Sequence, residues 1–191
     1  EYVNGAVAPF VAGQLALGAF ETGEESYGVD ILKRMGRKIS RDGKVAFLYN
    51  WQGQDIGGGP RCWCGAELMH AECAGLAGVV DNGKLFRNVT FSPRFAAAGE
   101  NRAYVRLEYA ASGASAEYEF RADYERKKLE FRLVSGHGKA KLRMLIPGGC
   151  TPLKVLISGD PVEFSDETVG GSHYAVVEQL PAGSIAEIWD Q

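Results

Sequence analysis

The hydrophobic pattern of this chain of 191 residues changes near residue 80, and that change constrains the fold more than any other feature. Before it, apolar side chains follow the three- and four-residue spacing of helices. After it, turn-forming groups of Gly, Asn, Asp, Ser and Pro recur, and the segments between them are alternating or rich in β-formers. The sequence therefore predicts an α+β protein with a helical segment at 1–80 and a strand-rich domain at 81–191.

Two helices of different character are expected near the N-terminus. Val3–Glu21 is apolar around its whole circumference, which predicts a helix that is buried on all sides. Either Asn4 caps this helix, or the helix starts near Ala8 with Pro9 in its first turn. Glu24–Arg41 repeats apolar residues at every fourth position and carries Lys and Arg on its other faces, as an amphipathic surface helix does. The pair predicts a helical hairpin with one inner and one outer helix.

A loop rich in glycine and aromatic residues follows this helical hairpin. It covers Asp42–Arg61, about twenty residues, which is longer than most connections and typical of functional loops. The triple glycine 57–59 lacks the Lys-Ser/Thr pair of a phosphate-binding loop, so a flexible loop is the favoured interpretation. A third helix is expected at Trp63–Gly78, where small residues would let neighbouring helices approach closely.

The second half of the chain predicts about eight strands. Their near-regular spacing favours an antiparallel β-sandwich over a parallel sheet. Within one strand, alternation places Val105 and Leu107 on one face and Tyr104 on the other. The expected strands are Phe86–Phe91, Ala103–Ala110, Ser115–Arg121, Lys128–Val134, Ala140–Ile146, Lys154–Ile157, His173–Glu178 and Ile185–Trp189.

Composition excludes several classes of function. The formal net charge is −3 and neither half is basic, so the chain has no electrostatic footprint for nucleic acid. The uncharged run 2–20 is nearly long enough to cross a membrane, but polar residues, glycines and a proline interrupt it, so no membrane span is expected. Without a basic start, this run is not a signal peptide either. Four cysteines fit no dense disulfide framework, which favours a reducing compartment such as the cytoplasm.

No metal or cofactor is expected from the motifs. Cys62, Cys64, Cys73 and His70 lie close together in the sequence, which leaves a mixed Cys/His metal site as one alternative, but the Cys62–Cys64 spacing is too tight for the usual zinc knuckle and no second pair follows. Small apolar residues on a buried helix are the favoured interpretation. Phosphate-binding, dinucleotide-binding and metalloprotease motifs are all missing from the sequence.

The aromatic loop is the candidate site. Sugar rings present C–H faces that stack on Trp and Tyr, and they present hydroxyls that bind amides and carboxylates. Tyr49, Asn50 and Trp51, together with Asp55 and the nearby Trp63, supply both kinds of group. Carbohydrate is therefore the ligand class that this loop suits. The alternative is that Tyr49, Trp51 and Trp63 pin a long loop to the helices.

Three segments carry a resemblance to a known group of enzymes. These segments read YVNGAVAPFVAGQLALGAFETG, FLYNWQGQDIGGGPRCWCGAELMHAECAGLAGV and AGLAGVVDNGKLFRNVTFSPRF. The first resembles the opening of an inner barrel helix in six-hairpin (α/α)6-toroid glycosidases and phosphorylases. The second resembles the closing section of that barrel in the processing α-glucosidase and trehalase branch. The third resembles the exit into a C-terminal β-sandwich, as in cellobiose phosphorylase-like and α-L-rhamnosidase-like enzymes.

The resemblance implies glycoside hydrolysis by two carboxylates. In the α-glucosidase branch the base is a Glu of the late loop, but no Glu stands at the matching place near Tyr49. Asp55 is the one acid in the loop after its first residue, so the base is either Asp55, an acid from another helix, or a group of different chemistry. The implied sugar contacts are Asn50, Trp51, Trp63 and Tyr49, with Tyr2 and Asn4 at the mouth of the preceding helix.

Three helices cannot close a ring, so the resemblance implies that most of the barrel lies upstream of Glu1 and that this upstream portion is the main partner. Two other interpretations stay open. The chain is a non-catalytic carbohydrate-binding or interaction module, or it is a structural remnant that forms a homo-oligomer through an apolar helix face.

Overall fold

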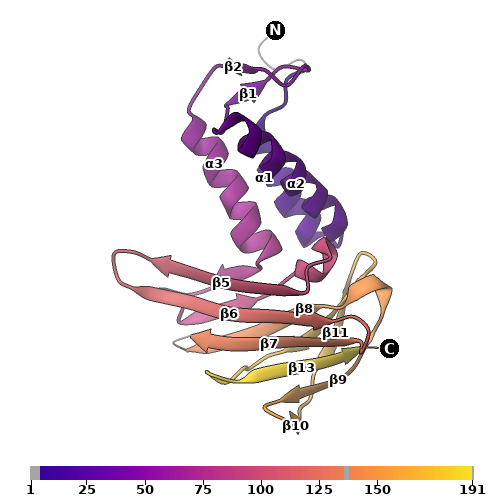
Figure 1. The fold of residues 1–191 in the computed structure, drawn as a ribbon. Helices are drawn as coiled ribbons and strands as arrows, with labels where there is room; N and C mark the ends of the chain where they lie inside the picture. The colour runs from indigo at the N-terminus through magenta and orange to yellow at the C-terminus, as the bar shows by residue number, and fades with distance from the viewer. Residues whose placement is uncertain (1–4, 136–137, 191) are drawn as a thin grey trace. The chain divides into compact units, whose positions relative to one another are not determined.

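The computed structural model describes residues 5–135 and 138–190 (Figure 1). Its contacts divide the chain into two units, Glu1–Gly75 and Leu76–Gln191, so the division lies a few residues before the change in sequence pattern. The first unit is helical and the second is rich in strands, which makes the chain a mixed α+β protein.

The first helix, α1, spans Pro9–Glu21 and starts at the later of the two expected positions. Pro9 occupies its first turn, where a missing N–H group leaves no hydrogen bond unmade. Asn4 lies outside the described residues. The expectation that this helix is buried on all sides is wrong for this chain, because Val11 and Leu15 are each 48% exposed.

The second helix, α2, spans Glu25–Asp42 and is amphipathic as expected. Ile31, Leu32 and Met35 are buried, while Tyr27, which the pattern assigned to the same stripe, is half exposed. The helix ends at Gly43, whose φ of 66° is the left-handed conformation that terminates helices.

Helix α1 packs against both α2 and α3, and glycines make the close approach possible. A Cβ atom added to Gly13 would lie 2.6 Å from the backbone of Glu67 in α3. A Cβ atom on Gly28 of α2 would lie 3.0 Å from the carbonyl oxygen of Ala16. The helices of this unit therefore meet along backbone surfaces that carry no side chain.

The expected loop at Asp42–Arg61 contains a small β-hairpin. Strand β1 (Leu48–Tyr49) pairs with strand β2 (Asp55–Gly57), and Val7 adds a further bridge to Tyr49. Helix α3 spans Arg61–His70 and continues as a π-helical segment, η1, at Ala71–Leu76. The third helix was thus expected at nearly the right place, but its widened last turns were not foreseen.

The strand-rich unit holds two sheets of six and five strands, in the orders β10-β9-β13-β7-β6-β5 and β11-β12-β8-β4-β3. The eight expected strands are all present, as β4 (Asn88–Phe91), β5 (Arg102–Tyr109), β6 (Ala114–Asp123), β7 (Lys128–Ser135), β8 (Lys139–Leu145), β9 (Pro152–Ile157), β12 (Ser172–Val177) and β13 (Ile185–Asp190). Three short ones were missed, β3 (Val79–Asp81), β10 (Asp160–Pro161) and β11 (Ser165–Val169). Two short 3-10 segments, η2 (Phe95–Ala98) and η3 (Pro147–Gly149), lie in the connections.

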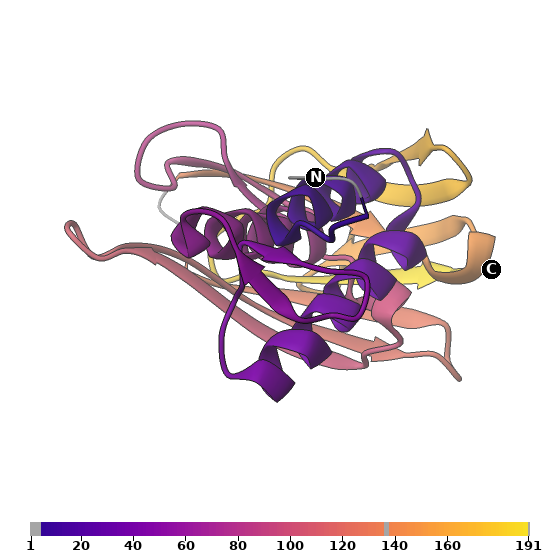
Figure 2. The same ribbon diagram turned by 90° about the horizontal axis from the view of Figure 1, so that it is seen from above.

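Most strand pairs are antiparallel, as expected, but β4 and β8 run parallel. The long hairpin of β5 and β6 aligns eight residue pairs, from Arg102 opposite Arg121 to Tyr109 opposite Ala114 (Figures 1 and 2).

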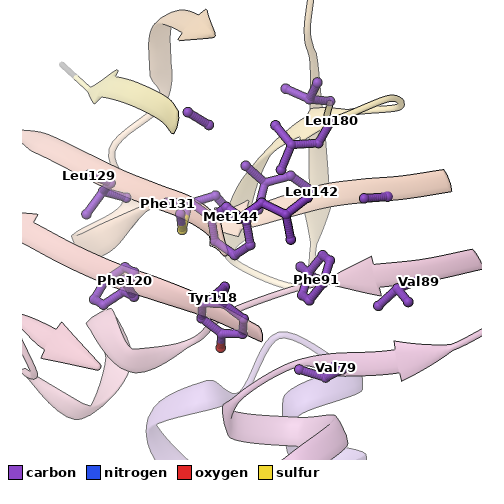
Figure 3. Packing of buried hydrophobic residues seen from close by; sticks show 14 of the residues in the cluster. Val79, Val89, Phe91, Tyr118, Phe120, Leu129, Phe131, Leu142, Met144 and Leu180 are labelled. Atoms are coloured by element: carbon purple, nitrogen blue, oxygen red, sulfur yellow. The ribbon is translucent and has the colours of Figure 1, made fainter. Parts of the chain in front are cut away.

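One apolar cluster takes its side chains from both sheets. Phe91 of β4 contacts Phe131 of β7, with ring centroids 5.4 Å apart, and Phe131 stacks on Tyr118 of β6 at 4.8 Å (Figure 3). The hydroxyl of Tyr118 donates a hydrogen bond to the carbonyl oxygen of Ala77, 2.5 Å away, and burial raises the pKa of this hydroxyl well above its ordinary value. The aromatic residues of this cluster therefore hold the two sheets face to face.

We expect that Gly13→Ala will lower the free energy of unfolding of the helical unit by about 1–3 kcal/mol, because the added methyl group overpacks the contact with Glu67. Gly18→Ala is the matched control in the same helix, since no atom lies within 4 Å of an added Cβ there. The control should raise stability by up to about 1 kcal/mol. Denaturant unfolding of both variants measures the difference, and equal effects would contradict the close α1–α3 contact.

Candidate functional site

The candidate site is built on the turn that joins β1 to β2. The side-chain oxygen of Asn50 accepts hydrogen bonds from the backbone N–H groups of Gln52 (3.0 Å) and Gln54 (2.9 Å). Its amide nitrogen donates to Oε1 of Gln54 at 2.9 Å. Backbone hydrogen bonds between Asn50 and Gln54 and between Gly53 and Asn50 close the turn. Asn50 thus uses its side chain to fix the conformation of this turn.

Trp51 stands at the tip of the turn and is 82% exposed. Its neighbour Asn50 holds the backbone on both sides of it. Covering a large apolar ring that is exposed to water lowers the free energy, which favours binding. Because the backbone of the turn is already held closed, binding does not have to order it, so Trp51 is well placed to stack against a ligand.

Tyr49 lies below the turn and is buried, with an exposed fraction of 2%. Its backbone exchanges two hydrogen bonds with Val7, and its hydroxyl accepts one from the N–H group of Ala46 at 3.3 Å. The ammonium group of Lys38 lies 4.3 Å from the ring centroid. In this structure Tyr49 has no free ring face, so it acts as an anchor of the hairpin, which is the alternative that the sequence had left open.

Asp55 joins the hairpin to the segments on either side of it. Its carboxylate lies 2.8 Å from the ammonium group of Lys44 and 2.9 Å from the guanidinium group of Arg61. It also accepts a hydrogen bond from the backbone N–H group of Gly57 at 2.9 Å. The hydrogen bond from Lys44 and then that from Gly57 lower the pKa of Asp55 below its ordinary value. Such a carboxylate is ionised at neutral pH, and its oxygens are already occupied by donors that hold the loop in place.

Trp63 lies in the first turn of α3 and is half exposed. Its ring stacks on Phe10 of α1 with centroids 4.8 Å apart, and Phe10 stacks in turn on Phe47 at 5.9 Å. The thiol of Cys64 donates a weak hydrogen bond to the carbonyl oxygen of Phe47 at 3.7 Å. Two aromatic rings from separate segments, Phe10 and Phe47, therefore fix Trp63 while leaving part of its surface open.

The structure sorts the residues expected at the site into three groups. Trp51 and Trp63 are accessible, Asn50 is partly exposed and uses its side chain within the turn, and Tyr49 is buried and Asp55 is ion-paired. Tyr2 and Asn4 lie outside the described residues. The contributions of Phe10, Lys44 and Arg61 were missed. The two cations flank the acid of the loop in the sequence, and that pattern of charge could have indicated the ion pairs.

Two further kinds of site were sought in the described ranges 5–135 and 138–190. Within them, no group of three or more His, Cys, Asp or Glu side chains is arranged to hold a metal ion. None of the helices described there combines the length and hydropathy that a membrane crossing requires.

Comparison with known proteins places the fold. No protein-family model matches the sequence, and no curated protein matches it either. Among solved structures, an α-L-rhamnosidase from Dictyoglumus thermophilum matches 96% of this chain with a TM-score of 0.60 and 12% sequence identity. This chain covers 21% of that protein. The matched region therefore includes both units, and the fold is one found within a larger glycoside hydrolase.

Two other structures give weaker matches. One is described as a glycoside hydrolase, with 15% identity and a TM-score of 0.41 over 69% of this chain and 19% of its own. The other is a cycloalternan-forming enzyme from Listeria monocytogenes in complex with a pentasaccharide substrate, with 15% identity and a TM-score of 0.39 over 54% of this chain and 10% of its own. At these TM-scores neither match supports an argument about this chain.

We expect Asp55→Asn to make the melting temperature less dependent on pH under acidic conditions. The pKa of Asp55 is lowered in the folded chain, so its ion pairs stabilise the fold above the ordinary pKa of an Asp. That stabilisation disappears as the pH falls below about 4 and the carboxylate takes up a proton. Melting temperatures of wild type and D55N, measured between about pH 2 and pH 7, should therefore converge at low pH.

The control for this measurement is Asp30→Asn, which removes an exposed carboxylate that pairs with Arg34 within α2. Its melting temperature should follow that of the wild type over the whole pH range. If D55N were less stable than the wild type by the same amount at every pH, the ion pairs of Asp55 would not be the source of the acid response.

Proposed function

We propose that this chain is the C-terminal portion of a carbohydrate-active enzyme, a glycoside hydrolase. In this proposal the helical unit supplies the last helices of an (α/α)6 barrel and an aromatic hairpin that contacts sugar. The strand-rich unit is an accessory β-sandwich. The observation that carries the proposal is Trp51, an indole ring 82% exposed on a turn that Asn50 holds closed.

The exposed apolar face of the helices supports the idea of an upstream portion. Val11 and Leu15 lie one turn apart on α1, and each is 48% exposed, while Met69 on α3 is 63% exposed. Exposed apolar side chains on packed helices are where another protein segment can pack. We propose that the upstream helices of the same protein cover these side chains. The reason is that nearly the whole of this chain, both units included, corresponds to only 21% of the length of a larger hydrolase.

Glycoside hydrolysis requires a general acid and a second carboxylate that serves as base or nucleophile. The role of Asp55 as that second carboxylate stays a prediction. Its ionised state suits a base, but Lys44 and Arg61 would have to yield a carboxylate oxygen before a water molecule could be activated. The general acid belongs to the upstream portion in this proposal, and no cofactor takes part.

Two alternatives lead to different experimental results. A non-catalytic carbohydrate-binding module would bind sugar through Trp51 and Trp63 without any upstream portion. A structural remnant would use the apolar face of α1 and α3 to form a homo-oligomer. The first alternative is tested by ligand binding to this chain, and the second by its mass in solution.

We expect Trp51→Ala to lower the affinity for neutral oligosaccharides by at least about tenfold, because a central exposed aromatic ring dominates such contacts. The measurement is a glycan-array screen of the longer protein that contains this chain, followed by calorimetric titration with the strongest ligand. Tyr27→Ala is the control, since it removes an aromatic ring that is 50% exposed on α2. Unchanged affinity in W51A would sink the assignment of the hairpin as a sugar contact.

The homo-oligomer alternative predicts that Leu15→Lys shifts this chain toward the monomer, because a charge on the apolar face opposes the burial of that face against another copy. Light scattering across a concentration series measures the mass of wild type and variant. A wild-type chain that stays monomeric at high concentration would contradict the homo-oligomer, and in the longer protein the same substitution should instead destabilise the barrel.

A further inference from the structure

The outer face of the six-stranded sheet carries two arginines directly opposite each other. Arg102 of β5 is the register partner of Arg121 of β6, at the end of the long hairpin. Like charges in directly opposite positions destabilise a sheet. This pair therefore costs stability unless something of opposite charge compensates it.

The surrounding face is otherwise well compensated. On the outer faces of β5, β6 and β7, Arg106 pairs with Glu108 at 2.6 Å and Arg132 lies 4.0 Å from Glu119. Lys128 pairs with Glu187 and lies 3.9 Å from Glu130. The cations of this face are thus generally neutralised by a neighbour on the same or the next strand.

The arginine pair departs from that pattern. Arg121 has one ion pair, with Glu119 at 3.3 Å. In the part of the chain that the structure describes, Arg102 has no carboxylate within ion-pair distance. Both guanidinium groups are exposed to solvent and retain unused N–H donors. On its other side Arg121 faces Glu130 of β7 in the register, so the positive charge left without a partner at this place is that of Arg102.

Two hollows in the surface meet at these arginines. One has a volume of about 300 Å³ and is lined by Tyr104 and Glu119 among others. The second, of about 310 Å³, is lined by Asn101, Lys128 and the two acids Asp123 and Glu130 among others. Arg102 and Arg121 line both of them. The two hollows together form an open groove across β5, β6 and β7, with the arginine pair at its middle.

An aromatic ring borders the same groove. Tyr104 is 59% exposed and lies two residues from Arg102, on the same face of β5. Its hydroxyl donates a hydrogen bond to Glu117 of the neighbouring strand, which fixes the direction of the ring. The groove thus offers two guanidinium groups and one stacking surface within a few residues of each other.

We propose that this groove binds an acidic saccharide, with the carboxylate of an internal uronate residue between Arg102 and Arg121. Guanidinium groups bind carboxylates through paired N–H donors. In this arrangement the C–H face of an adjacent sugar ring lies on Tyr104, and the chain continues into the hollow lined by Asn101. This site lies on the strand-rich unit and is independent of the sugar contacts proposed for the β1–β2 hairpin.

The test is calorimetric titration of this chain with an oligogalacturonate of defined length. We expect Arg102→Gln and Arg121→Gln each to lower the affinity by about tenfold or more, since each removes a charge-assisted contact to the carboxylate. Tyr104→Phe should keep the affinity and Tyr104→Ala should lower it. Arg87→Gln, an exposed arginine of the turn before β4, is the control and should leave the affinity unchanged.

Two further probes define the ligand class. The methyl-esterified form of the same oligosaccharide keeps the sugar rings but removes the charge, so it should bind far more weakly. Inorganic sulfate should compete poorly, and competition as strong as that of the oligosaccharide would overturn the saccharide in favour of a plain anion site. Absence of binding by the wild type, or equal binding by wild type, R102Q and R121Q, would overturn the proposal.

Folding and the hairpin site are controlled separately. R102Q should retain the wild-type melting temperature or exceed it, because it relieves a like-charge pair, so loss of binding cannot then be ascribed to unfolding. Loss of binding in W51A with normal binding in R102Q would place the acidic saccharide on the hairpin and overturn the groove.

Discussion

The contact between the backbones of α1 and α3 is the constraint on which the helical unit depends. Gly13 and the peptide group of Glu67 leave no room for a Cβ atom between them. Two helices at this separation bring their first turns close together, which is where Phe10 of α1 stacks on Trp63 of α3. The aromatic stack is thus a consequence of how closely the helices pack, and it exists only while that approach is maintained.

The hairpin inherits its position from the same packing. Phe47 precedes β1 and joins the aromatic stack through Phe10, and Cys64 of α3 holds the carbonyl oxygen of Phe47. At its other end, Asp55 of β2 is joined to Arg61 at the beginning of α3. The turn that carries Trp51 is therefore held in place by side chains of α1, α3 and β2 and by Phe47 before β1.

Much of the fold follows from periodicity, because periodicity reports which side chains share a face. Glu24–Arg41 has the four-residue repeat of a helix with one buried side, and α2 is that helix. Alternation in β5 buries Val105 and exposes Tyr104 as expected. The parallel pairing of β4 with β8 had no such signal, because a strand's own pattern does not specify the direction of its neighbour.

The sequence locates the aromatic loop but does not show which of its aromatic rings are buried. Tyr49 and Trp51 are two residues apart and chemically alike, yet one is buried and the other is 82% exposed. Strand β1 has two residues, too few for alternation to assign a face, and the turn that reverses the chain is set by the side chain of Asn50. The burial of α1 was overestimated for a different reason, since a sequence shows that a helix is apolar but not whether its partner is in the same chain.

The two proposed binding surfaces differ in the physical force that would dominate each of them. At the hairpin, Asn50 uses its amide within the turn and the carboxylate of Asp55 is ion-paired with Lys44 and Arg61. The surface that remains for a ligand is the uncharged, apolar indole of Trp51. On the sheet, the arginine pair offers charge at an exposed position, where added salt screens the attraction. Ionic strength should therefore separate the two surfaces: binding at the groove weakens as salt is added, while stacking on Trp51 persists.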